Sequence, residues 1–338
     1  MKFGRTVATA AVLGIALTGC SASGGNGGGE NAEGESYSWD FTITVSDTSS
    51  WYAGAERFAE ILDEKSDGRI QVNIFANEQL SGGDPAAGVE QLMNGDKAFS
   101  YNSTIIYSGI DPRFGAINAP FLYDSYETAD EAIESGGLEA YQDLAAEHGV
   151  QLLGFGESGF RQITNNKVEI TTPDDVRGLK LRVPGSSLFL GIYEELGADP
   201  LTMNFSEVFT SLQTGTIDGQ ENPYDVIYSN GLAEVQDYLT VWNYVYDPLM
   251  LGMNKDLFDS LSPEDQALVE EAAAEANEFQ REMNRERGEE QLAEMSETMT
   301  VTELTPEQVQ EFRDVIAPVY DEFTSIWTQE LLDAVTPE

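Results

Sequence analysis

The sequence predicts an α/β protein with two domains and one long helix, and three observations support that fold class. Short segments of alternating apolar residues are separated by segments with apolar residues every three or four positions, as in strands that alternate with helices. The 338 residues are enough for two domains that each bury a core. After Pro263 the helical spacing continues to about Met295, which indicates either a coiled-coil-like arm or a helix that bridges two domains.

The first part of the chain predicts strands and helices in alternation. Residues 37–46 place a tryptophan, a phenylalanine, an isoleucine and a valine on one face and form the first predicted strand. A helix over 51–65 follows, because its apolar residues fall at helical spacing, and residues 70–74 alternate again as a second strand. A further helix is predicted over 85–94 and a further strand over 98–101. This order indicates a substantially parallel sheet.

The remaining elements are indicated by periodicity and by helix start signals. Residues 127–148 are predicted to be helical, and residues 152–155 are predicted to form a strand. Helices are predicted to begin after Thr172, Ser262 and Thr305, because each is a capping residue followed directly by proline. The sequence contains no internal repeat of fixed period.

The segment GLKLRVP at 178–184 is the most informative in the chain. Its alternation predicts a short strand with three apolar residues on one face and Lys180 and Arg182 on the other. Pro184 ends the strand, so Arg182 is expected at the carboxyl end, where open α/β sheets bind ligands. The guanidinium has a fixed fork of donors that matches a carboxylate. The pattern therefore predicts a site for an anion.

The chain is strongly acidic, with 60 Asp plus Glu, 17 Lys plus Arg and a formal net charge of -43. This charge disfavours nucleic acid and anionic lipid surfaces as partners. The hydrophobic content of 41% is ordinary for a folded protein, so the acidity is expected on the surface. It indicates either solubility alone or an ion-rich exterior in which salt screens the repulsion between the acids.

The first residues predict secretion and membrane attachment. Residues 1–19 have a basic start and an apolar run that is shorter than the roughly 20 residues a spanning helix needs, and are predicted to be a signal peptide. Cys20, the only cysteine, resembles the lipobox cysteine that is lipidated in bacterial lipoproteins; an ordinary signal peptide with a chance cysteine is the alternative. Residues 20–36 are predicted to be a lipid anchor and flexible linker.

The absence of certain residues and motifs from the sequence argues against several kinds of catalytic and metal site. His148 is the only histidine and is expected at a solvent-facing helix end, which argues against Ser-His-Asp and Cys-His mechanisms and against His/Cys zinc sites. Neither a P-loop nor a dinucleotide-binding fingerprint is present. Paired carboxylates for glycoside hydrolysis remain possible, and so do oxygen-ligand calcium sites, although no EF-hand loop pattern occurs.

A series of motifs runs along the chain: RIQV at 69–72, QLSG at 79–82, APFL at 119–122, GLKLRVP at 178–184, LGADP at 196–200, EVFTSLQTG at 207–215 and DGQENP at 218–223. Most of them are weak alone, but their order and spacing are specific. Through these motifs, residues 37–284 resemble the solute-binding proteins of TRAP transporters, the DctP-like family (extracellular solute-binding protein family 7).

The resemblance implies a two-lobed periplasmic-binding-protein-like fold with crossing hinge strands and a long helix that bridges the lobes. Lobe I is expected to comprise 37–157 plus 247–285, and lobe II 158–246 plus 286–338. The solute is expected to bind between the lobes and to be enclosed by closure of the hinge.

The resemblance further implies an extracytoplasmic receptor that is not an enzyme and needs no cofactor. The expected solute is a small organic acid, either a C4-dicarboxylate or a sugar acid such as a uronate. The expected partners are a small DctQ-like and a large DctM-like membrane subunit, with membrane attachment through lipidated Cys20. A secreted carbohydrate-active enzyme with paired carboxylates and a binding lobe associated with a sensor are the alternatives.

The family motifs also imply site residues. Arg182 corresponds to the arginine that pairs with the solute carboxylate, and Arg161 to a second arginine that could equally brace the hinge. Asn222 corresponds to an asparagine that binds the solute; because it stands where metal-binding relatives have tryptophan, no metal is expected. The other candidates are contacts or walls of the cleft: Phe205, Trp51, Asn102, Ser103, Phe121 and Tyr224.

Overall fold

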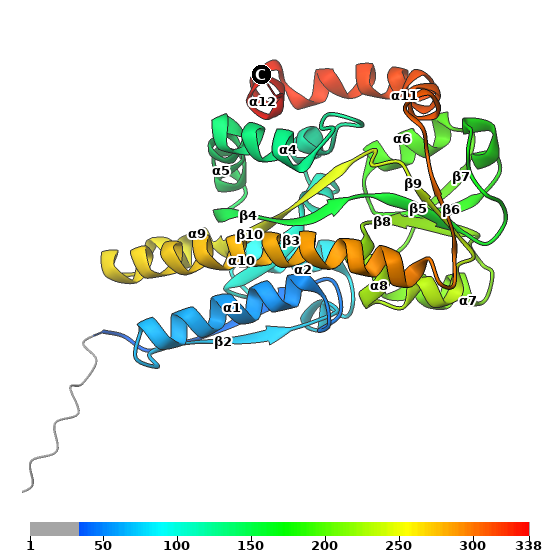
Figure 1. The fold of residues 1–338 in the computed structure, drawn as a ribbon. Coiled ribbons are helices and arrows are strands. Elements are labelled where there is room, and N and C mark those ends of the chain that lie inside the picture. Colours follow the sequence, from blue (N-terminus) through cyan, green and yellow to red (C-terminus); the bar gives the residue numbers. More distant parts are fainter. Residues whose placement is uncertain (1–33, 338) are drawn as a thin grey trace, which may run out of the picture. The chain divides into compact units, whose positions relative to one another are not determined.

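The computed structural model describes residues 34–337. The predicted signal peptide, Cys20 and most of the predicted linker lie outside the described residues. Within the described range two sheets and the helices around them form the fold (Figure 1). None of the described helices has the length and apolar character needed to cross a membrane.

The first sheet has five strands in the order β2-β1-β3-β10-β4. β1 is parallel to both β2 and β3, as the alternation of strands and helices predicts. β10 runs antiparallel between β3 and β4, because it enters from the second sheet and not through a crossover helix. The strands are β1 Tyr37–Ile43, β2 Ile70–Phe75, β3 Phe99–Ser103, β4 Val150–Phe160 and β10 Tyr246–Asn254.

The second sheet has six strands in the order β11-β9-β5-β8-β6-β7. β6, which carries Arg182, is parallel to its neighbours β7 and β8. β5 is antiparallel to β8 and β9, and β11 is parallel to β9. The strands are β5 Gln162–Asn165, β6 Lys180–Val183, β7 Asp199–Thr202, β8 Gly219–Asn222, β9 Tyr238–Val241 and β11 Thr300–Glu303.

Helices pack on both sheets through their apolar faces. In α1, Ser49 caps the first turn by accepting from the backbone N–H of Tyr52, and the predicted stripe that includes Phe58 is buried. The helices other than the longest one are α1 Ser50–Lys65, α2 Pro85–Met93, α3 Thr104–Ser108, α4 Tyr126–Ala132, α5 Leu138–Glu147, α6 Ser187–Glu195, α7 Val208–Gln213, α8 Tyr224–Ser229, α9 Lys255–Asp259, α11 Pro306–Trp327 and α12 Gln329–Val335.

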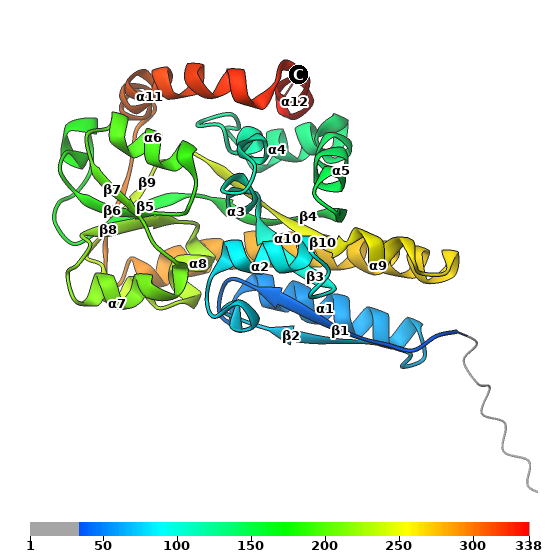
Figure 2. The same cartoon turned by 180° about the vertical axis from the view of Figure 1, so that it is seen from behind.

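The longest helix, α10 (Pro263–Met295), has 33 residues and decides between the two alternatives for this segment. It packs against α1 and β4 of the first sheet and against α8 beside the second, so it bridges the two halves (Figures 1 and 2). Its buried face carries polar residues that the apolar periodicity did not indicate. Gln280 is one of them: it accepts from the N–H of Glu157 at 2.8 Å and donates to the carbonyl of Glu157 at 2.7 Å.

Two chain segments cross between the sheets. The first passes from β4 to β5 at Arg161, and the second returns from β9 to β10 through residues 242–245. The predicted crossing strands of a two-lobed fold are therefore present. The parts built on the first and second sheets are called lobe I and lobe II below; the predicted boundaries at 157/158 and 246/247 stay a prediction.

Several predicted elements differ in extent from the observed ones. The helix predicted over 127–148 is interrupted at 133–137, where Gly136 leaves the helical conformation and packs near α12. The helix start at Thr172 leads only to a short 3-10 turn, Pro173–Val176. β1 stops three residues before the predicted end, and β4 extends well past 155, because it continues into the crossing.

His148 also differs from its prediction. It ends α5 as expected, but its side chain is only 24% exposed, its Nε2 lies 2.9 Å from Oδ2 of Asp111, and its ring packs near Phe114.

Candidate functional site

A cavity lies between the two sheets, where the carboxyl ends of β1, β3, β6 and β8 converge. Open α/β folds bind ligands at such ends, because the strands there deliver side chains and loops to one place. The space that a water-sized sphere can enter is about 30 Å³, enough for roughly two water molecules. The lining residues are Thr44, Val45, Trp51, Ser103, Ile105, Ile106, Arg161, Arg182, Pro184, Phe205, Asn222, Val226 and Asp247.

Arg182 enters this cavity from the end of β6. Its side chain is 4% exposed, and its guanidinium lies 5.7 Å from the centre of the Phe205 ring. Nε and Nη2 both donate to the carbonyl of Met203, at 3.1 and 2.9 Å. Among the described residues Arg182 has no carboxylate in salt-bridge contact. Burial lowers the pKa of Arg182 to about 10, although the charge of Glu221 opposes that shift.

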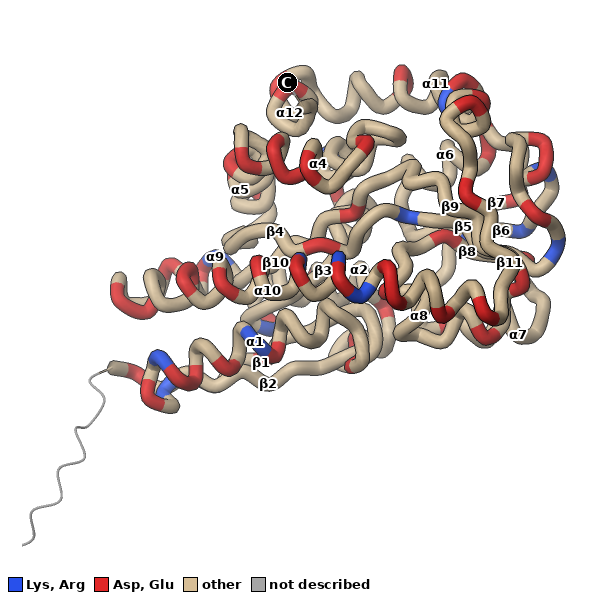
Figure 3. Tube along the Cα trace, viewed as in Figure 1, with Lys and Arg blue, Asp and Glu red and all other residues tan. Residues whose placement is uncertain are grey.

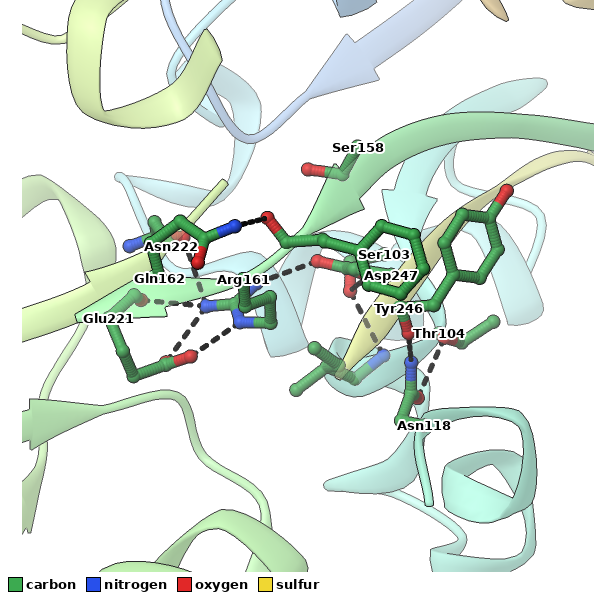
Figure 4. A network of polar contacts seen from close by, with 12 residues as sticks. Ser103, Thr104, Asn118, Ser158, Arg161, Gln162, Glu221, Asn222, Tyr246 and Asp247 are labelled. Carbon is green, nitrogen blue, oxygen red and sulfur yellow. Dashed lines mark hydrogen bonds and ion pairs between the residues drawn. The ribbon is translucent and has the colours of Figure 1, made fainter. Parts of the chain in front are cut away.

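Arg161 lies at the crossing of β4 into β5 and has a different environment. Its Nε and Nη2 bind the Glu221 carboxylate at 2.5 and 2.8 Å, and its Nη1 lies 2.6 Å from Oδ2 of Asp247. Nη2 also donates to the Glu221 carbonyl and to Oδ1 of Asn222. Figure 4 shows these partners around Arg161. Two carboxylates thus balance the charge of this arginine. Burial lowers the pKa of Arg161, and the ion pairs with Glu221 and Asp247 raise it.

Asp247, at the start of β10, was not indicated by the sequence pattern. It is fully buried, and its Oδ1 accepts from the Ser103 hydroxyl at 2.5 Å. Desolvation raises the pKa of Asp247 to about 6 against the opposing effect of Arg161. A signal was present in the sequence: Asp247 is the one charged residue in the otherwise apolar segment 244–253, and a buried carboxylate requires a partner.

Four more of the predicted residues line the cavity: Ser103, whose hydroxyl donates to Asp247, and Phe205, Asn222 and Trp51. Phe205 forms a wall beneath Arg182, and Asn222 is held between Arg161 and Gln220, to which its Nδ2 donates. Trp51 is 3% exposed at the start of α1, and its indole N–H has no hydrogen-bond partner among the described residues. A buried donor without a partner is costly, so a ligand that accepts from it would gain affinity.

Three predicted residues lie elsewhere. Asn102 is buried behind the cavity, where it donates to Glu78 and accepts from the Thr44 hydroxyl. Phe121 packs edge-on against Trp242 beneath Arg313, beside a separate surface hollow. Tyr224 begins α8 and packs with the apolar cluster around α7 and β9. Asn102 was expected at the site because it follows a predicted strand, and Phe121 and Tyr224 because of the family resemblance; neither signal fixes the direction of a side chain.

A buried ion pair lies behind Thr44 in lobe I. The side chains of Lys97 and Glu78 are each 1% exposed, with Nζ 3.6 Å from the carboxylate of Glu78. Lys97 also donates to Thr42, and Glu78 accepts from Asn102 at 2.8 Å. The charges of this pair cancel each other and do not reach the cavity surface.

The lobes touch each other around the cavity. The hydroxyls of Ser108 and Ser186 lie 2.8 Å apart, and the Ser206 hydroxyl donates to the carbonyl of Gly83 at 3.2 Å. A Cβ on Gly109 would lie 2.4 Å from the carbonyl oxygen of Gly185. The lobes are therefore in contact beside the cavity, and because only about 30 Å³ is accessible to water, a solute larger than a few water molecules requires them to separate.

Comparison with known proteins identifies this arrangement. The sequence profile "Bacterial extracellular solute-binding protein, family 7" (DctP) matches residues 41–326. The chain belongs to this family. It is 31% identical to the 2,3-diketo-L-gulonate-binding periplasmic protein YiaO of Escherichia coli, over 72% of this chain and 74% of that protein.

Solved structures of other members agree with the described fold. The sugar acid binding protein DctPAm of Advenella mimigardefordensis, in complex with galactonate, matches with a TM-score of 0.86 and 32% identity, over 90% of this chain and 98% of that one. A TRAP periplasmic solute-binding protein of Sulfurospirillum deleyianum with bound succinate matches with a TM-score of 0.82 and 26% identity, over 89% and 98%. The protein is therefore a TRAP solute-binding protein, of a family that works outside the cytoplasm with membrane subunits.

Proposed function

We propose that this TRAP solute-binding protein captures a small organic acid, a sugar acid or a C4-dicarboxylate, by pairing its carboxylate with Arg182. The observation that carries the proposal is a buried guanidinium with no carboxylate partner among the described residues, lining a cavity between two lobes. Burial of an unpaired charge is unfavourable. A carboxylate from solution would remove that cost through two charge-assisted hydrogen bonds.

The relatives support the same chemistry. Sugar acids and succinate appear with the similar structures, and each of these solutes offers a carboxylate. Arg182 stands in the motif that resembles the family's carboxylate-binding arginine. In this proposal Trp51 and Asn222 contact the remainder of the solute. Arg161 stabilises the crossing between the lobes, because its guanidinium is already paired with Glu221 and Asp247.

The lobes enclose the solute and release it by hinge motion. Contacts such as Ser108 with Ser186 and Ser206 with Gly83 stabilise the closed arrangement once water has left the cavity. The loaded protein then delivers the acid to small DctQ-like and large DctM-like subunits. Attachment through lipidated Cys20 would keep the receptor close to them; Cys20→Ala should release the protein from membranes, which cell fractionation would detect.

The test is isothermal titration calorimetry of the purified protein with gluconate, galactonate, glucuronate, galacturonate, erythronate, succinate and tartrate, with glucose as the neutral control. At least one acid is expected to bind with a Kd near or below micromolar, which corresponds to roughly -8 kcal/mol. Arg182→Ala should abolish that binding. If no acid binds, or if the variant binds the same acid equally well, the proposal is wrong.

The protein is proposed to return its solute unchanged and not to act as an enzyme. The two acids next to the cavity, Glu221 and Asp247, are both engaged by Arg161 and so are poorly placed to act as a catalytic pair. NMR spectra of a bound acid recorded before and after prolonged incubation should be identical. The appearance of a product would instead favour the alternative function, a secreted carbohydrate-active enzyme with paired carboxylates.

A further inference from the structure

The charges around the cavity distinguish between the two classes of acid. Among the residues that the structure describes, two cationic side chains line it, Arg161 and Arg182, together with the carboxylate of Asp247. Arg161 has its charge balanced by Asp247 and by Glu221 directly behind it. The cavity as described therefore offers one cation that is not matched by a protein carboxylate, which is Arg182.

Among the described residues that line the lobe I side of the cavity, Asp247 alone is charged. Thr44 and Ser103 lie there with hydroxyls that donate to Asn102 and Asp247, and Trp51 has an indole N–H without a partner among the described residues. Lys97 of lobe I is buried and paired with Glu78, and its side chain is 1% exposed. These neutral groups suit the hydroxyls of a solute, because hydroxyls both donate and accept hydrogen bonds.

Building on the proposed function, we infer that the solute carries a single carboxylate with hydroxyls along its chain, and that Asp247 excludes a second carboxylate. The first carboxylate pairs with Arg182. A second one would enter an enclosed space with no free cation and would face the carboxylate of Asp247. Two like charges in a drained cavity repel strongly, and each also loses its hydration.

Asp247 is therefore the specificity-determining residue, through repulsion of the wrong solute more than attraction of the right one. It is rigidly placed, because Arg161 holds Oδ2 at 2.6 Å and Ser103 holds Oδ1 at 2.5 Å. These two contacts each use one oxygen of the Asp247 carboxylate, and the carboxylate keeps its negative charge. A monocarboxylate polyol such as an aldonate or a uronate satisfies the whole arrangement.

Matched pairs of acids provide the test, since an aldonate and its aldarate differ only in whether the last carbon is an alcohol or a carboxylate. Calorimetry at pH 7.5 would compare gluconate with glucarate, galactonate with galactarate, and 4-hydroxybutyrate with succinate. In the tightest-binding pair, the monocarboxylate is expected to bind at least tenfold more tightly. Equal or tighter binding of the dicarboxylate would overturn the inference.

Asp247→Asn keeps the shape of the side chain and removes its charge, while Glu221 still balances Arg161. The variant is expected to reduce the preference for the monocarboxylate by at least tenfold, mainly by improving binding of the dicarboxylate. Asp265→Asn is the matched control: Asp265 is also buried, but it pairs with Arg69 at the start of α10 and should leave the preference unchanged. Thermal unfolding would verify that both variants fold.

The outcomes separate the two proposals. A dicarboxylate that binds tightly and depends on Arg182 would overturn the single-carboxylate inference and leave the carboxylate receptor intact. Loss of the preference in Asp265→Asn as well as in Asp247→Asn would show that total charge, and not Asp247, sets it. Absence of binding by every acid of the panel would overturn both proposals.

Discussion

Nη1 of Arg161 lies 2.6 Å from Oδ2 of Asp247, and this ion pair joins the two segments that cross between the lobes. Arg161 follows β4 on the outward crossing, and Asp247 is the second residue of β10 after the return. Glu221, at the end of β8, binds the other side of the same guanidinium. The arginine thus fixes the hinge, whereas Arg182, which has no such partner among the described residues, remains available to a solute.

Arg182→Met should therefore separate function from stability. We expect it to weaken acid binding by about 2–5 kcal/mol, because the solute carboxylate loses its charged partner. The free energy of unfolding without solute should stay equal or increase, by up to about 2 kcal/mol, since a buried unpaired charge is removed. Calorimetry and urea denaturation measure the two effects. A large loss of stability would show that Arg182 has a structural role instead.

Arg161→Met should, in contrast, lower the free energy of unfolding. It leaves two buried carboxylates, Glu221 and Asp247, without their cation, and removal of one partner of a buried pair costs about 3–5 kcal/mol. We expect a marked fall in the unfolding free energy in urea, with partial recovery in the double variant with Asp247→Asn. Unchanged stability of the single variant would contradict the bracing role.

The pH dependence of stability should carry a contribution from Asp247. Its pKa is raised to about 6, chiefly by desolvation, although Arg161 and Ser103 oppose the shift and Glu221 shares the same guanidinium. A carboxyl whose pKa is raised on folding favours the native state at low pH, and this contribution is lost as the pH rises through about 6. Between pH 4 and pH 7, Asp247→Asn should gain stability relative to the wild type by about 1–3 kcal/mol. A difference that stays constant over this range would contradict the raised pKa.

Closure of the lobes can be tested with one pair of glycines. Gly109 has an ordinary helical backbone conformation, yet a Cβ there would lie 2.4 Å from the Gly185 carbonyl oxygen on the other lobe. Gly109→Ala should weaken acid binding by at least about 1.4 kcal/mol, a tenfold change, because it opposes the closed state. Gly185→Ala is the control, since a Cβ there meets no atom within 4 Å. Equal effects in the two variants would contradict the closure model.

The acidity predicts a dependence on salt. Figure 3 shows acidic residues along α10 and on most of the other helices, and the formal net charge of the chain is -43. Because salt screens repulsion between exposed charges, the melting temperature without solute should rise between 10 mM and 1 M NaCl. Differential scanning calorimetry measures this. A melting temperature independent of salt would favour solubility as the sole role of the acidity.

Much of the fold could be predicted because its signals are local. Apolar alternation marked β1 and β2, and helical spacing with a cap and proline marked α10 within a residue or two. The interruption of the helix at 133–137 was not predicted. The apolar spacing continues through Gly136, whereas the approach of Gly136 to α12 is a tertiary contact that the local sequence does not record. The polar buried face of α10 was not predicted for a similar reason. Gln280 binds the backbone of Glu157 in β4, and this partner is far away in the sequence.

The position of each candidate side chain was harder to predict than its element. Arg182 comes at a strand end that the alternation in 178–184 marks, Asn222 stands in the family motif at 218–223, and both line the cavity. Asn102 also ends a strand, but the alternation of side chains turns it behind the sheet and brings its neighbour Ser103 to the cavity. An error of one residue in register is enough to exchange these roles.

The sequence by itself determined several of the strands, the long helix and the placement of Arg182 near a strand end, because these depend on neighbours within a few residues. Only the tertiary structure decided that Arg161 is neutralised while Arg182 has no carboxylate partner among the described residues. The reason is that the partners of Arg161, Glu221 and Asp247, lie 60 and 86 residues away in the chain. Charge pairing in a buried site is set by which strands the fold brings together, and no local pattern records it.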